Sequence, residues 1–185
     1  MGVKELFSAI VAVLLRNGRF WLELKETPPS EESNVMRDYA VPLIALVQLA
    51  KFPLIGQPRV AMYFCIATFL IDVAALFLLT GGTLSLFEAK KRERFQESLS
   101  RVVSYSMTPV WMIELLYFLN GNWSFLFAAA AISYTLVIGR NGMKVTLDLA
   151  PAPSASALRN TALYLMAVNS ASFFLIRSLM RLFNL

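Results

Sequence analysis

The fold is decided by residues 60–87, VAMYFCIATFLIDVAALFLLTGGTLSLF, in which Asp72 is the only charged residue. A helix needs about 20 mostly apolar residues to cross a bilayer, and this stretch exceeds that length. A water-soluble domain of this size would instead show amphipathic periods. The sequence therefore predicts a protein embedded in a membrane.

Four further apolar stretches accompany this one, at residues 39–56, 102–119, 123–138 and 161–183. Hydrophobic residues make up 57% of the 185 residues and charged residues 16%, outside the range of ordinary soluble domains. We predict an all-α, polytopic membrane protein. Residues 39–185 form a bundle of five transmembrane helices, and residues 1–38 form a cytoplasmic amino-terminal arm.

The arm is predicted to carry an amphipathic helix that lies in the membrane interface, within residues 3–26. One face of this helix would gather apolar residues, namely Leu6, Phe7, Ile10, Val11 and Leu14. Phe20 and Trp21 are expected to be interfacial anchors. Arg16 and Arg19 follow the apolar run where a signal peptide would need small residues, so a cleaved signal is not predicted.

Basic residues are distributed unevenly between the two sides of the predicted bundle. Thirteen of the 17 Lys and Arg residues fall in the arm and in the loops after the second and fourth spans. Positive residues stay cytoplasmic, so the amino terminus is predicted inside and the carboxyl terminus outside. The basic run of Lys90, Lys91, Arg92 and Arg94 is expected to contact anionic lipid headgroups. Because the basic residues form no single face, nucleic acid is not an expected partner.

Glycine and proline residues are expected to interrupt the spans. Gly81 and Gly82 should weaken or end the second one, because glycine is a poor helix former. Pro42, Pro53 and Pro109 should kink or end helices. The charged stretch 84–101 is expected to be a cytoplasmic helix along the membrane surface, and residues 151–156 a plain connector.

A family resemblance rests on four pieces of sequence: RFWLELKET at 19–27, YAVPLIAL at 39–46, VVSYSMTP at 102–109, and Gly142, which is expected to end the fourth span. Together they resemble the YIP-domain family, the Rab-interacting membrane proteins and their prokaryotic relatives. The resemblance implies five spans with a cytoplasmic amino terminus. The short arm looks like the prokaryotic branch, so a prokaryotic plasma membrane is expected and the Rab-linked role of eukaryotic members is not carried over.

Four charged residues inside the predicted spans are the main candidates for a polar or ion site: Lys51, Asp72, Glu114 and Arg177. A charge near mid-bilayer costs at least about 2.5 kcal/mol on insertion scales, so something must offset it. In the structural interpretation, Glu114 pairs with Lys51 or Arg177, while Asp72 binds hydroxyl groups or is protonated, since burial disfavours a charged carboxylate. In the functional interpretation, Asp72 changes protonation in a polar cavity or ion path.

Tyr105, Thr108 and Pro109 form a second candidate site. Pro109 frees the carbonyl group of Tyr105, and nearby hydroxyl groups or water would satisfy it again. The alternative is that the kink lines a cavity facing Asp72.

The first functional prediction is a non-enzymatic membrane organiser or adaptor that acts through helix packing and self-association. Its expected partners are the lipid bilayer, a second copy of the chain and a protein of unknown identity. The alternative is a small transporter or ion-conducting protein using Asp72 and Glu114, although no internal repeat is evident. An enzyme, a metal site and a cofactor are not expected, because the chain has no histidine, HExxH motif or phosphate-binding loop.

Overall fold

The computed structural model describes residues 2–26, 34–87, 89–118, 123–147 and 151–185. Helices are the only regular elements that it assigns in these ranges. They are α1 (Val3–Leu15), α2 (Asn17–Glu26), the π-helical turn η1 (Met36–Ala40), α3 (Val41–Ile55), α4 (Pro58–Ser85), α5 (Ala89–Ser106), α6 (Thr108–Ile113), the 3-10 helix η2 (Glu114–Phe118), α7 (Trp123–Thr146) and α8 (Pro151–Leu182).

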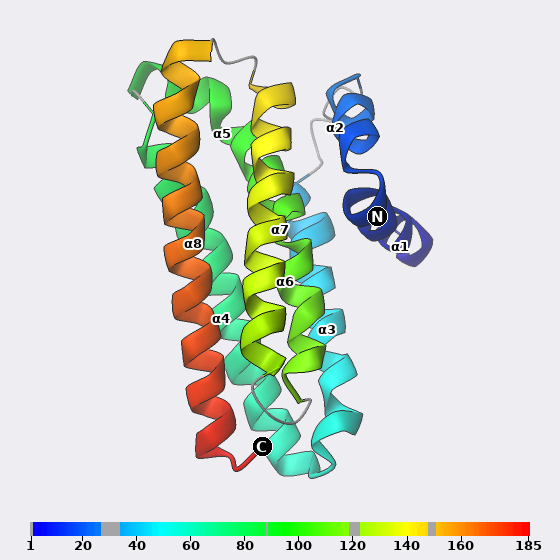
Figure 1. Ribbon diagram of the computed structural model, residues 1–185. Helices are drawn as coiled ribbons and strands as arrows, with labels where there is room; N and C mark the ends of the chain where they lie inside the picture. The colour runs from blue at the N-terminus through cyan, green and yellow to red at the C-terminus, as the bar shows by residue number, and fades with distance from the viewer. Residues whose placement is uncertain (1, 27–33, 88, 119–122, 148–150) are drawn as a thin grey trace.

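Four helices of the described chain are long and apolar enough to cross a membrane. They span Met36–Ile55, Pro58–Ser85, Trp123–Thr146 and Leu158–Leu182. Figure 1 shows α3, α4, α7 and α8 side by side in one bundle. Large apolar side chains such as Leu70, Phe77 and Phe174 are exposed on its outside, which suits contact with lipid rather than water. The all-α, multi-pass architecture therefore matches the prediction at this level.

The third predicted span, residues 102–119, is not one continuous helix. Its described residues are divided among the end of α5, a break at Met107, α6 and η2. The segment is enclosed by the other helices, and Val103, Met107 and Trp111 are all buried. Irregular backbone is tolerated at membrane depth where protein surrounds it, which explains how the break survives in such an apolar environment.

The glycine pair does not end the second span, contrary to the prediction. Helix α4 continues through Gly81 and Gly82 to Ser85. A Cβ atom on Gly82 would lie 2.2 Å from the ring of Tyr164 on α8. The Tyr164 hydroxyl donates a hydrogen bond of 3.0 Å to the carbonyl of Leu78. Gly82 therefore leaves space for the Tyr164 side chain, whose hydrogen bond joins α8 to α4.

The three prolines stand in different places of their helices. Pro109 is in the first turn of α6, where the missing N–H is not needed, whereas Pro42 lies where the π-helical turn η1 passes directly into α3. Pro53 lies in the last turn of α3, which Gly56 closes with a left-handed φ of 73°. The predicted connector at 151–156 is wrong, because α8 already begins at Pro151.

The amino-terminal arm forms two helices instead of one, with a break at Arg16 between α1 and α2. Leu6, Ile10 and Val13 are buried against the bundle. Phe7 and Val11, predicted on the same face, are exposed. The apolar residues of α1 therefore do not form one face: Leu6 and Ile10 pack on the bundle, whereas Phe7 and Val11 are exposed.

Trp21 is not a lipid-exposed anchor, because its side chain is fully buried. It lies against Gly142, where a Cβ atom would come within 2.7 Å of the indole ring. Helix α7 runs through Gly142 to Thr146, so the prediction that this glycine ends the fourth span is wrong. Its role is to let α2 approach α7.

Helix α5 begins at the end of the bundle where α4 ends and α8 starts (Figure 1). The carboxyl terminus and the α3–α4 turn lie at the opposite end. Arg92 on α5 donates hydrogen bonds of 3.0 and 3.1 Å to the carbonyls of Phe87 and Ser85. It thereby satisfies carbonyl groups at the end of α4. The side chains of Lys90, Lys91 and Arg94 lie outside the described residues.

Candidate functional site

A buried polar cluster connects α3, α4 and η2 in the half of the bundle nearer the carboxyl terminus. We define it as Gln48, Lys51, Thr68, Asp72 and Glu114. Each side chain is 5% exposed or less, although the surrounding helix faces are apolar. Polar groups in such a place are stable only when they find partners, so the hydrogen bonds of the cluster decide its chemistry.

Helix α3 supplies Gln48 and Lys51, which are three residues apart and therefore share a face of the helix. The Lys51 Nζ atom donates a hydrogen bond of 2.8 Å to Gln48 Oε1. It also lies 5.8 Å from the centre of the Phe64 ring, within the range of a cation–π interaction. The Phe64 ring thus lies on one side of the Lys51 ammonium group.

Helix α4 supplies Thr68 and Asp72, four residues apart on its inward face. Gln48 connects them: its Nε2 donates to Asp72 Oδ2 at 2.8 Å, and its Oε1 accepts from Thr68 Oγ1 at 2.5 Å. The Gln48 amide is therefore held in one orientation by donors and an acceptor from two helices. Cys65 also faces this region, where its thiol donates to the Gln48 carbonyl at 3.2 Å.

The third element is η2, which begins at Glu114. Lys51 Nζ and Glu114 Oε2 are 2.5 Å apart, and both side chains are 1% exposed. Breaking a buried pair by removal of one partner typically costs about 3–5 kcal/mol, because the other charge is stranded. This ion pair therefore fixes the interrupted segment to α3.

Asp72 and Glu114 belong to one chain of hydrogen bonds, in which Gln48 joins Asp72 to Lys51 and Lys51 pairs with Glu114. Glu114 Oε1 is buried and finds no donor among the described residues. The cluster thus holds two carboxyl groups against one ammonium group. With all three ionised, it would carry a net charge of −1 inside the apolar bundle.

Arg177 does not join this cluster, although the sequence allowed it as a partner of Glu114. Its guanidinium carbon lies 5.6 Å from the centre of the Phe125 ring, which belongs to α7. Its Nε atom has no hydrogen-bond partner among the described residues. The structure thus brings together three of the four predicted charged residues, and the partner of Glu114 is Lys51.

Gln48 was not among the residues predicted for the site. It lies in the apolar run YAVPLIALVQLAKF and carries no charge, so counting intramembrane charges did not reveal it. Its spacing from Lys51 was the available signal, because three residues place two side chains on one face of a helix. Thr68 was also not predicted as a member of the cluster, because it too carries no charge.

The Tyr105–Pro109 candidate has a packing role. The Thr108 hydroxyl donates to the Tyr105 carbonyl at 2.7 Å, which is the hydroxyl compensation expected for Pro109. Tyr39 and Thr108 share a further hydrogen bond of 2.6 Å between their hydroxyl groups. Among the described residues, the hydrogen bonds of Thr108 go to Tyr105 and Tyr39 and not to Asp72.

Aromatic rings surround Tyr105 and join the arm to the bundle. The ring centres of Phe20 and Tyr39 lie 4.8 and 4.5 Å from that of Tyr105, and the Trp21 ring lies 6.2 Å away. Gly142 completes the group through its contact with Trp21. Residues of α2, η1, α5 and α7 thus meet in one place.

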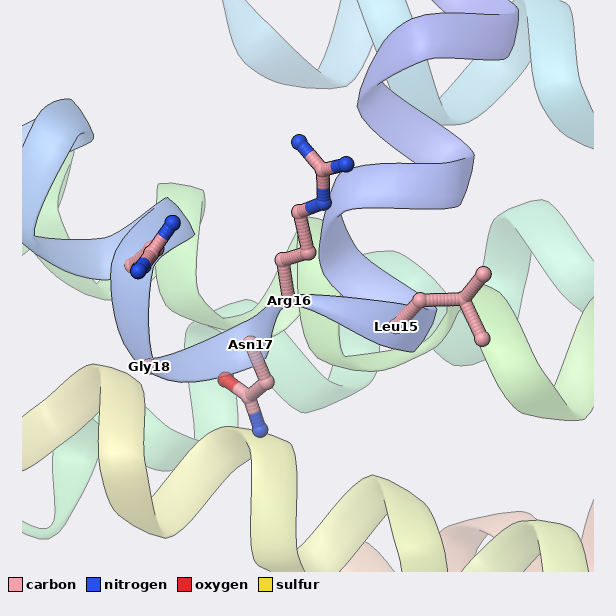
Figure 2. Close-up of a pocket in the computed structure, with 5 residues that line it drawn as sticks. Leu15, Arg16, Asn17 and Gly18 are labelled. Atoms are coloured by element: carbon pink, nitrogen blue, oxygen red, sulfur yellow. The ribbon is translucent and has the colours of Figure 1, made fainter.

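An open depression lies at the hinge between α1 and α2, lined by residues 15–19 (Figure 2). None of the polar-cluster residues lines it. Among the described residues, no group of three His, Cys, Asp or Glu side chains could hold a metal ion.

Comparisons with protein-family models, with curated proteins and with solved structures find no match for this chain. The fold and site define a class, a multi-pass helical membrane protein with a buried network of charged and polar side chains. Its function has to be inferred from the chemistry of that network and of the surface.

Proposed function

We propose that the chain is a non-enzymatic membrane organiser or adaptor, related in form to the YIP-domain family, which acts through helix packing and self-association. The observation that carries this proposal is the burial of the bundle's charges. Lys51, Asp72 and Glu114 are 3% exposed or less, and each has a partner within the cluster. Such charges hold helices together, whereas an ion path or a catalytic site has to be reached from water.

The proposed topology has five membrane crossings, of which the interrupted α5–α6–η2 segment is the third. Helix α2, the start of α5 and the start of α8 lie toward one end of the bundle, and α1 lies farther along its side (Figure 1). Together with the rest of the arm, the rest of α5 and the end of α7, these segments carry 13 basic residues, against 4 on the other side. This asymmetry supports a cytoplasmic amino terminus and an external carboxyl terminus. The membrane is proposed to be a prokaryotic plasma membrane, because the short arm looks like the prokaryotic branch of the family.

The arm is proposed to lie against the cytoplasmic membrane interface while docked on the bundle. Val3, Phe7, Val11 and Leu15 follow one another at intervals of four residues on α1, and all are exposed. An apolar stripe of this kind gains stability from entering the headgroup–acyl boundary. Anionic headgroups would meet the basic residues at this end of the protein.

Self-association is proposed through the outer face of α7. Ala129, Ala130 and Ser133 are exposed there, whereas Ala128 and Ala131 face the bundle. Small residues let two membrane helices approach closely, which supplies the van der Waals contact that drives their association. The face is flanked by the exposed apolar side chains of Leu126 and Val137.

Cysteine cross-linking in native membranes tests this proposal. Cys65→Ser removes the one natural cysteine, and Ala130→Cys then places a thiol on the proposed face. Leu163→Cys, on the exposed side of α8, is the matched control. We expect a disulfide-linked dimer for Ala130→Cys only. A dimer that forms equally at both positions, or at neither, would contradict association through α7.

The second candidate, a small transporter, is favoured by one observation. Glu114 lies on an interrupted segment inside the bundle, and discontinuous helices often form the binding sites of transporters. Proton or cation flux into proteoliposomes distinguishes it from the organiser. If the parent protein shows flux and Asp72→Asn abolishes it, the result would support transport. If the parent protein shows no flux, the organiser is the better account.

A further inference from the structure

We infer that Asp72 and Glu114 form a proton-binding site, in which their two carboxyl groups share one proton and Lys51 is the fixed counter-charge. The inference goes beyond the organiser role and does not depend on it. It begins with the charge count of the cluster, where one ammonium group can neutralise only one of two buried carboxylates. A single added proton makes the cluster neutral.

The unpaired oxygen of Glu114 shows where that proton belongs. Glu114 Oε2 is occupied by Lys51, whereas Oε1 is buried without a donor among the described residues. Asp72 and Glu114 are linked through Gln48 and Lys51, and Gln48 already occupies the Oδ2 atom of Asp72. A proton between the two carboxyl groups would give Glu114 Oε1 its missing partner. It would also remove the repulsion between two like charges at close range.

None of the neighbouring side chains in the described residues donates a hydrogen bond to Glu114 Oε1 in place of this proton. The Gln48 amide donates to Asp72, and the Thr68 hydroxyl is directed to Gln48. Tyr117 on η2 and Cys65 on α4 are the remaining titratable side chains nearby, and the Cys65 thiol is directed to the Gln48 carbonyl. Arg177, the charged residue of α8 in the bundle, stacks on Phe125 instead.

Proton release would have a structural consequence. It would leave a net negative charge among side chains of α3, α4 and η2 that are 5% exposed or less. The packing of α3, α4 and η2 against one another would therefore weaken when the proton leaves. Binding of the proton would stabilise that packing.

Infrared spectroscopy of the purified protein in proteoliposomes at neutral pH tests the inference. The C=O stretch of a protonated carboxyl group is separate from the carboxylate stretches, and it shifts in heavy water. Asp72 and Glu114 are the only buried carboxyl side chains of the described residues. We expect a signal of one protonated carboxyl group in the parent and none in Asp72→Asn or Glu114→Gln, because Lys51 neutralises the acid that remains. Asp38→Asn, in a pair with Arg37 in η1, is the control and should keep the signal.

Lys51→Met should double the signal, because both acids then need a proton; if this variant does not fold, the two acid variants carry the test. A signal that is missing from the parent, or that survives in either acid variant, would overturn the proposal. Sodium is the competing ligand. If replacing choline chloride by sodium chloride removes the signal, the site binds a sodium ion in place of the proton, and the inference is wrong.

Discussion

Replacement of Lys51 by methionine tests how much the buried Lys51–Glu114 ion pair contributes to the stability of the protein. Methionine keeps an unbranched chain of similar length but removes the ammonium group that pairs with Glu114 at 2.5 Å. Both partners are 1% exposed, so water cannot replace the lost interaction. Removal of one partner from a buried pair costs about 3–5 kcal/mol. For a chain of this length, that corresponds to a fall in the thermal midpoint of roughly 6–20 °C.

A double-mutant cycle separates the stranded charge from a simple loss of packing. In Lys51→Met/Glu114→Gln, the carboxylate that lost its partner is also gone, so we expect the second change to recover about 2–3 kcal/mol. The cost of Lys51→Met alone should also shrink as the pH falls, because the folded variant has to take up a second proton and this uptake costs less free energy at lower pH. Matched pH series of the parent and both variants would show this.

The assay is thermal unfolding of purified protein in one detergent, followed by tryptophan fluorescence and by circular dichroism. Trp21 and Trp111 are both fully buried, so their emission should report loss of tertiary packing. A Lys51→Met midpoint within about 1 °C of the parent would refute the reasoning. So would a double variant whose loss equals the sum of the single losses, since the two residues would then not interact.

Three further predictions concern single contacts. Gly142→Val should destabilise the protein by about 1–3 kcal/mol through overpacking against Trp21, and faster proteolysis of the arm would show its release. Tyr39→Phe removes the 2.6 Å hydrogen bond to Thr108 and should cost about 0.5–1.5 kcal/mol, measured by thermal unfolding. Gly82→Leu should lower the thermal midpoint by displacing Tyr164, whereas Gly81→Leu, where a Cβ atom meets nothing within 4 Å, should have little effect.

The apolar helices were predictable because their signal is local. Length and hydropathy alone indicate the stretch around Asp72, and the structure contains that stretch as α4. The interruption at Met107 was not predictable from the same signal. Its backbone is stabilised by the helices that bury it, and those contacts involve residues far away in the sequence. Propensity also misjudged Gly81 and Gly82, because membrane burial and the contact with Tyr164 outweigh the weak helix preference of glycine.

The candidate site was predictable as a set of charges but not as a network. Lys51, Asp72 and Glu114 are conspicuous because each interrupts an apolar stretch of the sequence. Gln48 is neutral, so nothing in a charge count marks it as the residue that connects the others. The place of Arg177 depends on the rotation of α8, which hydropathy does not specify.

The account depends above all on the polar cluster being closed to water, and the natural cysteine reports on this directly. Cys65 lies beside Gln48 and is 4% exposed. The measurement is its reaction with a membrane-impermeant thiol reagent, applied in turn to each side of sealed vesicles. Gln57→Cys in a Cys65→Ser background, at the exposed start of α4, is the positive control. The account predicts that Cys65 stays unlabelled from both sides while the control reacts from one. Rapid labelling of Cys65 from either side would contradict a closed cluster.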